Sequence, residues 1–306
     1  MSESRPIEVG FRKPPDTPRP GPTVRTRITS VTGDQARTKD DTLATEEPLE
    51  IRVHHRGTDH VIAVTMRTPG HDFELAVGFL SGEALIAGRE DITTVSYCKS
   101  GPPEQLYNIV TVELNERAAF DPARAQRNFY TTSSCGVCGK ASLESLSTAG
   151  CERLPDGPVI DAEMVGAMPK KMRANQRIFE RTGGLHAAGL FDGSGEMLFL
   201  REDVGRHNAV DKVVGKITLD GASAHGRILQ VSGRASFEIM QKALAAGISI
   251  VSAVSAPSSL AVSLAEEFNI TLLGFVRGDS FNIYANPSRI RFNSSGVSAS
   301  TTAADS

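Results

Sequence analysis

The chain has 306 residues, of which 40% are hydrophobic and 23% are charged, and its formal net charge is −3. This length predicts one large domain or two modest ones. The slightly negative charge argues against a broad nucleic-acid-binding surface, and no apolar run approaches the ~20 residues that span a bilayer. The first ten residues lack the apolar stretch of a signal peptide, and four cysteines in a long chain favour reduced thiols. We therefore expect a cytoplasmic protein without membrane or nucleic-acid partners.

Composition divides the chain into five segments. Residues 1–22 hold six prolines and few apolar side chains, and residues 294–306 are small and polar, so both ends are predicted to be disordered tails. Residues 23–130 are expected to form an α+β N-terminal domain. Residues 131–142 form a cysteine loop, and residues 143–293 are expected to form an α/β domain.

The N-terminal domain shows short alternating strands around one helix. Leu49 to Thr68 predicts two strands around an R-G-T-D turn. Asp72 is a candidate N-cap of the helix that follows, whose apolar face runs from Phe73 to Ala84. Two further strands are predicted at 92–97 and 107–114.

The second half alternates strands and helices more regularly. Strands are predicted at 185–191, 196–200, 227–231, 248–254, 270–276 and 281–284. Helices are predicted from Asp203 onward, at 236–246 and at 257–268. This alternation favours a mixed, largely parallel sheet that is covered on both faces.

Cys135 and Cys138 form a C-x-x-C pair at a predicted helix start, flanked by glycines and hydroxyl side chains. Unpaired backbone N–H groups at a helix start favour the thiolate, which is the reactive form of cysteine. The pair alone is compatible with half a zinc site, a dithiol redox pair, a sulfur carrier or two buried thiols. A structural zinc site needs further ligands at workable spacing, and none is present, so we expect no protein-bound zinc.

Four later segments carry polar side chains at turns or helix starts. Each is compatible with an ordinary turn or helix cap, and each is also a typical place for ligand contacts. Their candidate contact residues are His186, then Arg206 and His207, then Ser232 and Arg234, and finally the run Phe275, Val276, Arg277, Gly278, Asp279 and Ser280. An arginine, a flexible glycine and an aspartate in this last run can hold a guanine edge or a phosphate.

Taken in order, six segments resemble the formate dehydrogenase accessory protein family, FdhD, a group of sulfurtransferases. They read E-L-A-V-G-F-L, S-S-C-G-V-C-G, T-G-G-L-H-A-A, E-D-V-G-R-H-N-A-V-D-K, S-G-R-A-S-F-E and F-V-R-G-D-S-F-N-I-Y. The resemblance covers about residues 25–292. Six segments in one order are far more specific than any one of them.

The resemblance implies sulfur delivery to a molybdenum cofactor. A cysteine desulfurase would load Cys135 with a persulfide, with Cys138 in a secondary role. The sulfur would then pass to Mo-bis(molybdopterin guanine dinucleotide), bound as a substrate by residues 275–280, before the cofactor enters formate dehydrogenase. A homodimer is compatible with the resemblance. A dithiol–disulfide oxidoreductase and a non-enzymatic cofactor chaperone are the alternative functions.

The resemblance also implies a cytidine-deaminase-like α/β fold for the second half. Zinc deaminases carry H-x-E and P-C-x-x-C signatures. The nearest windows in this chain start at His186 and at Pro257, and they hold Ala188, Ser258 and Ala261 where the glutamate and the two cysteines would stand. Deamination is therefore not expected.

Overall fold

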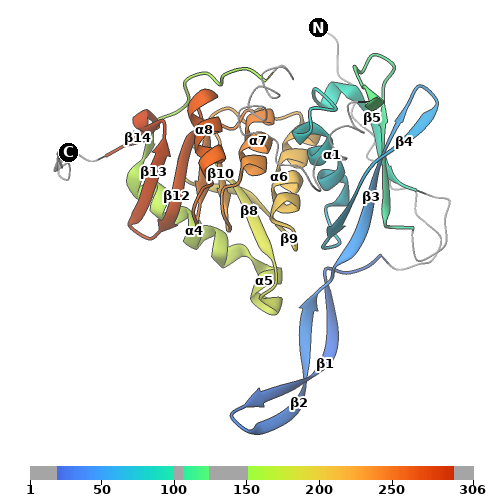
Figure 1. Cartoon of the computed structure of the whole chain (residues 1–306), viewed down its shortest axis with the longest axis vertical. Helices are drawn as coiled ribbons and strands as arrows, with labels where there is room; N and C mark the ends of the chain where they lie inside the picture. Colours follow the sequence, from blue (N-terminus) through green and yellow to red (C-terminus); the bar gives the residue numbers. More distant parts are fainter. Residues whose placement is uncertain (1–18, 99–105, 124–150, 293–306) are drawn as a thin grey trace.

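The computed structural model describes residues 19–98, 106–123 and 151–292 (Figure 1). These residues form a mixed α/β fold, as the sequence predicts. A four-stranded sheet with the order β4-β3-β6-β5 belongs to the first half of the chain, and a six-stranded sheet with the order β13-β12-β11-β10-β8-β9 belongs to the second. None of the helices in the described ranges is long and apolar enough to cross a membrane.

The chain begins with a hairpin that the sequence analysis did not predict. Strands β1 (Thr23–Thr32) and β2 (Gln35–Ala44) pair antiparallel over their full length. The hairpin projects from the body of the molecule (Figure 1) and is mostly exposed. Its second strand is almost entirely polar, so no alternation of apolar residues marks it in the sequence.

The first sheet packs one face against helix α1. Its elements are β3 (Glu47–His55), β4 (Thr58–Arg67), α1 (Asp72–Gly82), the short 3-10 helix Arg89–Asp91, β5 (Ile92–Tyr97) and β6 (Ile109–Leu114). Alternating residues Leu49, Ile51 and Val53 of β3 are fully buried in a core shared with Leu75 of α1. The predicted strand pair, helix and following strands of this region are confirmed.

One helix boundary differs from the prediction. Asp72 is the first residue of α1 rather than its cap, since His71 precedes it in a left-handed conformation (φ 57°). The Asp72 carboxylate instead pairs with the fully buried Arg67 at 3.1 Å and accepts a hydrogen bond from Tyr97 Oη at 2.7 Å. The ion pair with Arg67 and the hydrogen bond from Tyr97 therefore take the place of local capping.

The second half is a three-layer α/β unit. Its elements are β7 (Ile160–Asp161), α4 (Ala162–Asn175), α5 (Arg177–Thr182), β8 (His186–Phe191), β9 (Met197–Asp203), α6 (Arg206–Asp220), β10 (Ile228–Val231), α7 (Phe237–Ala245), β11 (Ile250–Ala253), α8 (Ser259–Glu267), β12 (Thr271–Arg277), β13 (Ser280–Ala285), the 3-10 helix Pro287–Arg289 and β14 (Ile290–Arg291).

Helices cover both faces of the six-stranded sheet, as predicted. Helices α6, α7 and α8 share one core with residues such as Leu229 and Val251, while Met168 and Met172 of α4 pack with Ile228 on the other side. The sheet is mixed, but parallel pairing is limited to β10, β11 and β12. Strands β8, β9 and β13 run antiparallel to their neighbours, so the parallel part is smaller than predicted.

Asp203 ends strand β9 and does not start a helix, which corrects the prediction. Helix α6 starts at Arg206, after Gly205. The Asp203 carboxylate is fully buried and lies 2.6 Å from Lys212 Nζ. It also accepts hydrogen bonds from the backbone N–H groups of Thr68 and Gly205. This carboxylate connects the two halves of the chain.

The two halves meet where α1 crosses α6, and the crossing depends on two glycines. A Cβ atom at Gly78 would lie 1.8 Å from the backbone oxygen of Asp211, and one at Gly215 would lie 1.7 Å from that of Glu74. No side chain fits between the two backbones at these positions. The predicted tails and the cysteine loop at 131–142 fall largely or wholly outside the described residues, so the predicted segment boundaries stay predictions.

Candidate functional site

The three parallel strands end at one edge of the six-stranded sheet, and the loops after them are joined by backbone hydrogen bonds. Ser255 N donates to Gly233 O at 3.3 Å, and Phe275 N donates to Ser255 O at 3.2 Å. Crevices beyond the carboxyl ends of parallel strands are the usual ligand sites of α/β sheets. This carboxyl edge is made of residues 232–236, 254–258 and 275–280 with the adjacent starts of β8 and α6. It holds all the predicted ligand contacts outside the cysteine loop.

His186, Arg206 and His207 come together at one end of the carboxyl edge. His186 is the first residue of β8 and is half-buried. Burial lowers its pKa below the ordinary value, and the charges of Arg206 and His207 lower it further against a smaller opposing effect of Asp203. The Nε atom of Arg206 is buried and has no hydrogen-bond partner among the described residues. The lowered pKa favours the neutral form of His186, and Arg206 contributes the permanent positive charge of this cluster.

His207 connects the starts of two helices. Its Nε2 atom lies 2.9 Å from Glu238 Oε2 and 3.2 Å from Ser236 Oγ, and both of these residues belong to the start of α7. The hydrogen bond from His207 lowers the pKa of Glu238 below its ordinary value. Glu238 was not predicted as a site residue. The sequence indicates that Glu238 lies in the first turn of a helix. It does not reveal the contact with His207, because the two residues are 31 positions apart.

Ser232 and Arg234 have different surroundings. Ser232 extends the pairing of β10 with β8, because its N–H donates to Ala187 O and its Oγ accepts from Ala187 N, each at 2.9 Å. Its hydroxyl is therefore used inside the fold. Arg234 is exposed beside Gly233, where a Cβ atom would lie 3.6 Å from Nδ1 of His186. Arg234 thus lies near the histidine and arginine cluster and is open to solvent.

The predicted cofactor run forms the turn between β12 and β13. Arg277, Gly278 and Asp279 are exposed, and Arg277 pairs with Ser280 across the hairpin. Phe275 is 41% exposed and adopts a left-handed conformation (φ 53°), which is uncommon for a bulky side chain. Helix α4 packs directly against the backbone of the turn, because a Cβ atom added at Gly166 would lie 1.9 Å from Gly278 O. The backbone of this turn is thereby held in place, while the side chains of Arg277 and Asp279 are exposed. Val276 is fully buried in the core beside α4, so its side chain is not available for the predicted ligand contact.

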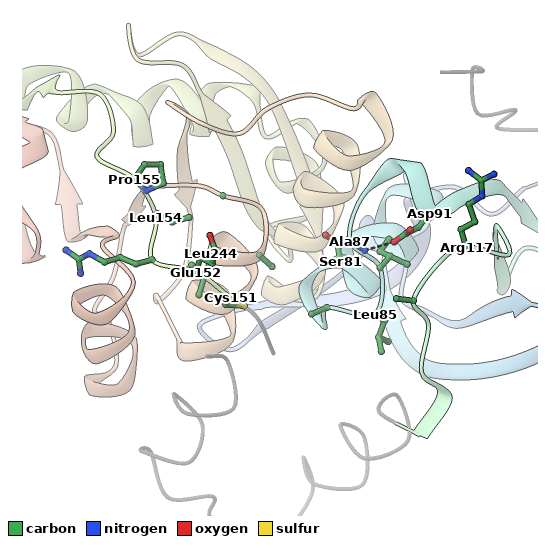
Figure 2. A pocket seen from close by; sticks show the side chains of 16 residues that line it. Ser81, Leu85, Ala87, Asp91, Arg117, Cys151, Glu152, Leu154, Pro155 and Leu244 are labelled. Carbon is green, nitrogen blue, oxygen red and sulfur yellow. Dashed lines mark hydrogen bonds between the residues drawn. The ribbon is translucent and has the colours of Figure 1, made fainter. Parts of the chain in front are cut away.

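Cys135 and Cys138 lie outside the described residues. The described part of the chain starts again at Cys151, which lines a cavity of about 700 Å³. In Figure 2, Ser81, Leu85 and Asp91 from the N-terminal half lie on one side of it, and Cys151 and Leu244 lie on the other. Leu244 is at the end of α7, so this cavity is at the opposite end of that helix from the carboxyl edge.

Within the described ranges, no group of three or more His, Cys, Asp or Glu side chains could hold a metal ion. The two deaminase-like windows lie on different kinds of element: His186 is on strand β8, whereas Pro257 precedes helix α8. The two helix starts that do lie side by side are those of α6 and α7, where His207 Nε2 lies 3.2 Å from Ser236 Oγ.

Comparisons with known proteins agree with this architecture. A model of the FdhD/NarQ family matches residues 44–291. The chain is 51% identical over 276 residues to the sulfur carrier protein FdhD of Mycobacterium tuberculosis, which covers 88% of this chain and 98% of that protein. It is 42% identical over 268 residues to the sulfur carrier protein FdhD of Sulfurisphaera tokodaii, with 87% and 98% covered.

A solved structure has the same fold. The crystal structure of a formate dehydrogenase accessory protein from Desulfotalea psychrophila matches with a TM-score of 0.69 and 24% identity. The match covers 88% of this chain and all of that one.

Proposed function

The chain belongs to the FdhD/NarQ family, and from this membership we propose that it carries sulfur as a persulfide on Cys135. The donor is a cysteine desulfurase. The acceptor is Mo-bis(molybdopterin guanine dinucleotide), bound as a substrate before it enters formate dehydrogenase. The observation that carries the proposal is the 51% identity, over nearly the full length, to a relative named sulfur carrier protein FdhD.

The chemistry needs an accessible thiolate and no external oxidant. The Cys135 thiolate attacks the outer sulfur of the desulfurase persulfide, a new S–S bond forms, the donor S–S bond breaks, and the desulfurase leaves as a thiolate. Cys138 offers one route for release. Its thiolate can attack the inner sulfur of Cys135, which forms a Cys135–Cys138 disulfide and frees the outer sulfur as hydrosulfide. In that route the dithiol supplies the two electrons.

The carboxyl edge is the proposed place for the cofactor, with residues 275–280 at one end. A guanine base offers acceptors to an arginine and donors to a carboxylate, and the exposed Arg277 and Asp279 supply both groups on one turn. Arg206 and Arg234 add positive charge for a polyanionic ligand at the other end, and His186 and His207 add ring N–H donors. Ser232 is the least suited of the predicted contacts, because its hydroxyl already accepts from Ala187 N.

Intact mass spectrometry after incubation with a cysteine desulfurase and cysteine tests the proposal. The wild-type chain should gain the mass of one sulfur atom, and Cys135→Ala should gain none. Loss of two protons without a sulfur gain would instead indicate a dithiol–disulfide oxidoreductase. Bound guanine nucleotide with no loading under any condition would indicate a cofactor chaperone.

A further inference from the structure

The starts of α6 and α7 face each other at the carboxyl edge, and neither start is capped by a side chain within the described chain. Gly205 precedes α6 and has no side chain to offer. Ser236 precedes α7, but its hydroxyl lies beside His207. Helix α8 differs, because Ser258 Oγ accepts from Ala261 N at 3.3 Å. Two uncapped helix starts therefore direct backbone N–H groups and positive dipole ends toward one place.

Arg206 and Arg234 supply the positive charge around these two starts. Arg206 has a buried Nε atom without a partner in the described structure, and His186 and His207 lie close enough to interact with it electrostatically. The buried carboxylate of Asp203 is also nearby, but it forms an ion pair with Lys212 Nζ at 2.6 Å. Glu238 is the carboxylate that contacts His207, and its side chain is 58% exposed. A side chain that exposed can turn into solvent at little cost.

We propose that the starts of α6 and α7 form a diphosphate site. In the free protein Glu238 is hydrogen-bonded to His207, and a phosphate group of the ligand displaces it. The proposal rests on the proposed function, because the ligand class is the diphosphate of a nucleotide-bearing cofactor. A phosphate group accepts several N–H donors at once and carries more charge than a carboxylate. It can therefore accept from both helix starts, Arg206 and His207 together, whereas Glu238 is hydrogen-bonded to His207 and interacts with Arg206 only through its charge.

The site is separate from the Arg277 turn. The turn follows β12, while the diphosphate site adjoins the loop after β10, two strand positions away, or roughly 10 Å at the usual spacing of strands. The loop after β11 lies between them and is hydrogen-bonded to both sides through Ser255. The edge is thus divided into a base end at Arg277 and a diphosphate end at Arg206 and His207.

Calorimetry with inorganic pyrophosphate, in phosphate-free buffer at pH 7, tests this division on the full chain. Wild type should bind pyrophosphate in competition with GDP. Arg206→Gln should weaken pyrophosphate binding about ten-fold or more, the scale of a lost charge-assisted contact. Glu238→Gln should tighten it several-fold, because the competing carboxylate is removed. Arg181→Gln, an exposed arginine on α5, is the matched control and should change nothing.

A general loss of structure would not weaken pyrophosphate binding in Arg206→Gln and tighten it in Glu238→Gln. Equal melting temperatures of the two variants and wild type exclude misfolding. Unchanged pyrophosphate affinity in both variants would overturn the diphosphate site. GDP binding that pyrophosphate does not compete with would also overturn it, while leaving the proposed function in place. Pyrophosphate binding that depends on Arg206, in a chain that does not bind GDP, would support the site and count against guanine recognition at Arg277.

Discussion

The α1–α6 crossing and the carboxyl edge are both rich in charge, but they use it in opposite ways. At the crossing, Lys212 and Asp203 are almost completely buried, and each is surrounded by hydrogen-bond partners. At the edge, the Nε atom of Arg206 has no hydrogen-bond partner in the part of the chain that the structure describes, and Arg277 is exposed. Satisfied charges fix the relative position of two halves, whereas unsatisfied charges remain available to a ligand.

One sequence segment supplies both regions. In E-D-V-G-R-H-N-A-V-D-K, residues Asp203, Asn208 and Lys212 face the crossing, where Asn208 Nδ2 donates to Met66 O at 2.7 Å. Arg206 and His207 face the edge. Helix α6 therefore links the carboxyl edge to the junction between the halves. A change at the crossing should alter stability, and a change at the edge should alter binding.

The largest expected effect is at the crossing. Lys212→Met leaves Asp203 buried without its cation, and we expect a loss of about 3–5 kcal/mol in the free energy of unfolding. Lys216→Met on the same helix removes an exposed pair with Asp220 and should cost less than about 1 kcal/mol. Urea denaturation of both variants measures the difference. Similar losses would show that the buried pair does not hold the halves together.

A smaller effect on the free energy of unfolding is expected for Glu74, and it should disappear at low pH. Burial would raise the pKa of Glu74, but hydrogen bonds from Arg201 and His71, with their charges, lower it to about 2 from 4.5. The folded-state pKa is the lower one, so the stabilisation is complete above pH 4.5 and is lost as the pH falls toward 2. Glu74→Gln should thus cost roughly 2 kcal/mol at pH 7 and almost nothing near pH 2.

The control for this experiment is Glu196→Gln, which removes an exposed pair with Lys171. Its stability difference from wild type should be small at every pH. Urea denaturation across the pH range gives both curves. A constant difference between wild type and Glu74→Gln from pH 7 down to 2 would contradict the role of the Arg201 contact.

The smallest effect is expected at the edge, and it concerns binding. Arg277→Ala should weaken GDP binding about ten-fold or more, the scale of a lost charge-assisted contact, and should leave unfolding unchanged because the side chain is exposed. Persulfide loading of Cys135 should also be unchanged, since it needs only the desulfurase and the thiol. Equal GDP affinities of wild type and Arg277→Ala in calorimetry would remove this side chain from the site.

Most elements that show apolar periodicity were predicted from the sequence. The β3–β4 pair and helices α6 to α8 bury regular apolar positions and were recognised. Helix α4 was missed because it contains Pro169 and is polar overall, and hairpin β1–β2 was missed because its strands are mostly exposed. Helix α4 nevertheless buries Val165, Met168 and Met172 at helical spacing, so this signal was present in the sequence, whereas the exposed hairpin carries no such pattern.

Errors at helix starts have a common cause. Asp72 was predicted as a helix cap and Asp203 as the start of a helix, but both carboxylates are used in ion pairs inside the fold. The Asp203 contact with Thr68 N spans 135 positions, which sequence spacing does not reveal. The candidate residues His186, Arg206 and His207 were identified separately, and only the fold shows that they form one cluster.

Activation of formate dehydrogenase tests the central proposal most directly. Cells that lack this protein but make a formate dehydrogenase would receive wild type, Cys135→Ala, Cys138→Ala or Cys98→Ser, with equal expression confirmed. We predict normal activity with wild type and Cys98→Ser, partial activity with Cys138→Ala and none with Cys135→Ala. Normal formate dehydrogenase activity with Cys135→Ala would contradict the assignment of Cys135 as the sulfur carrier.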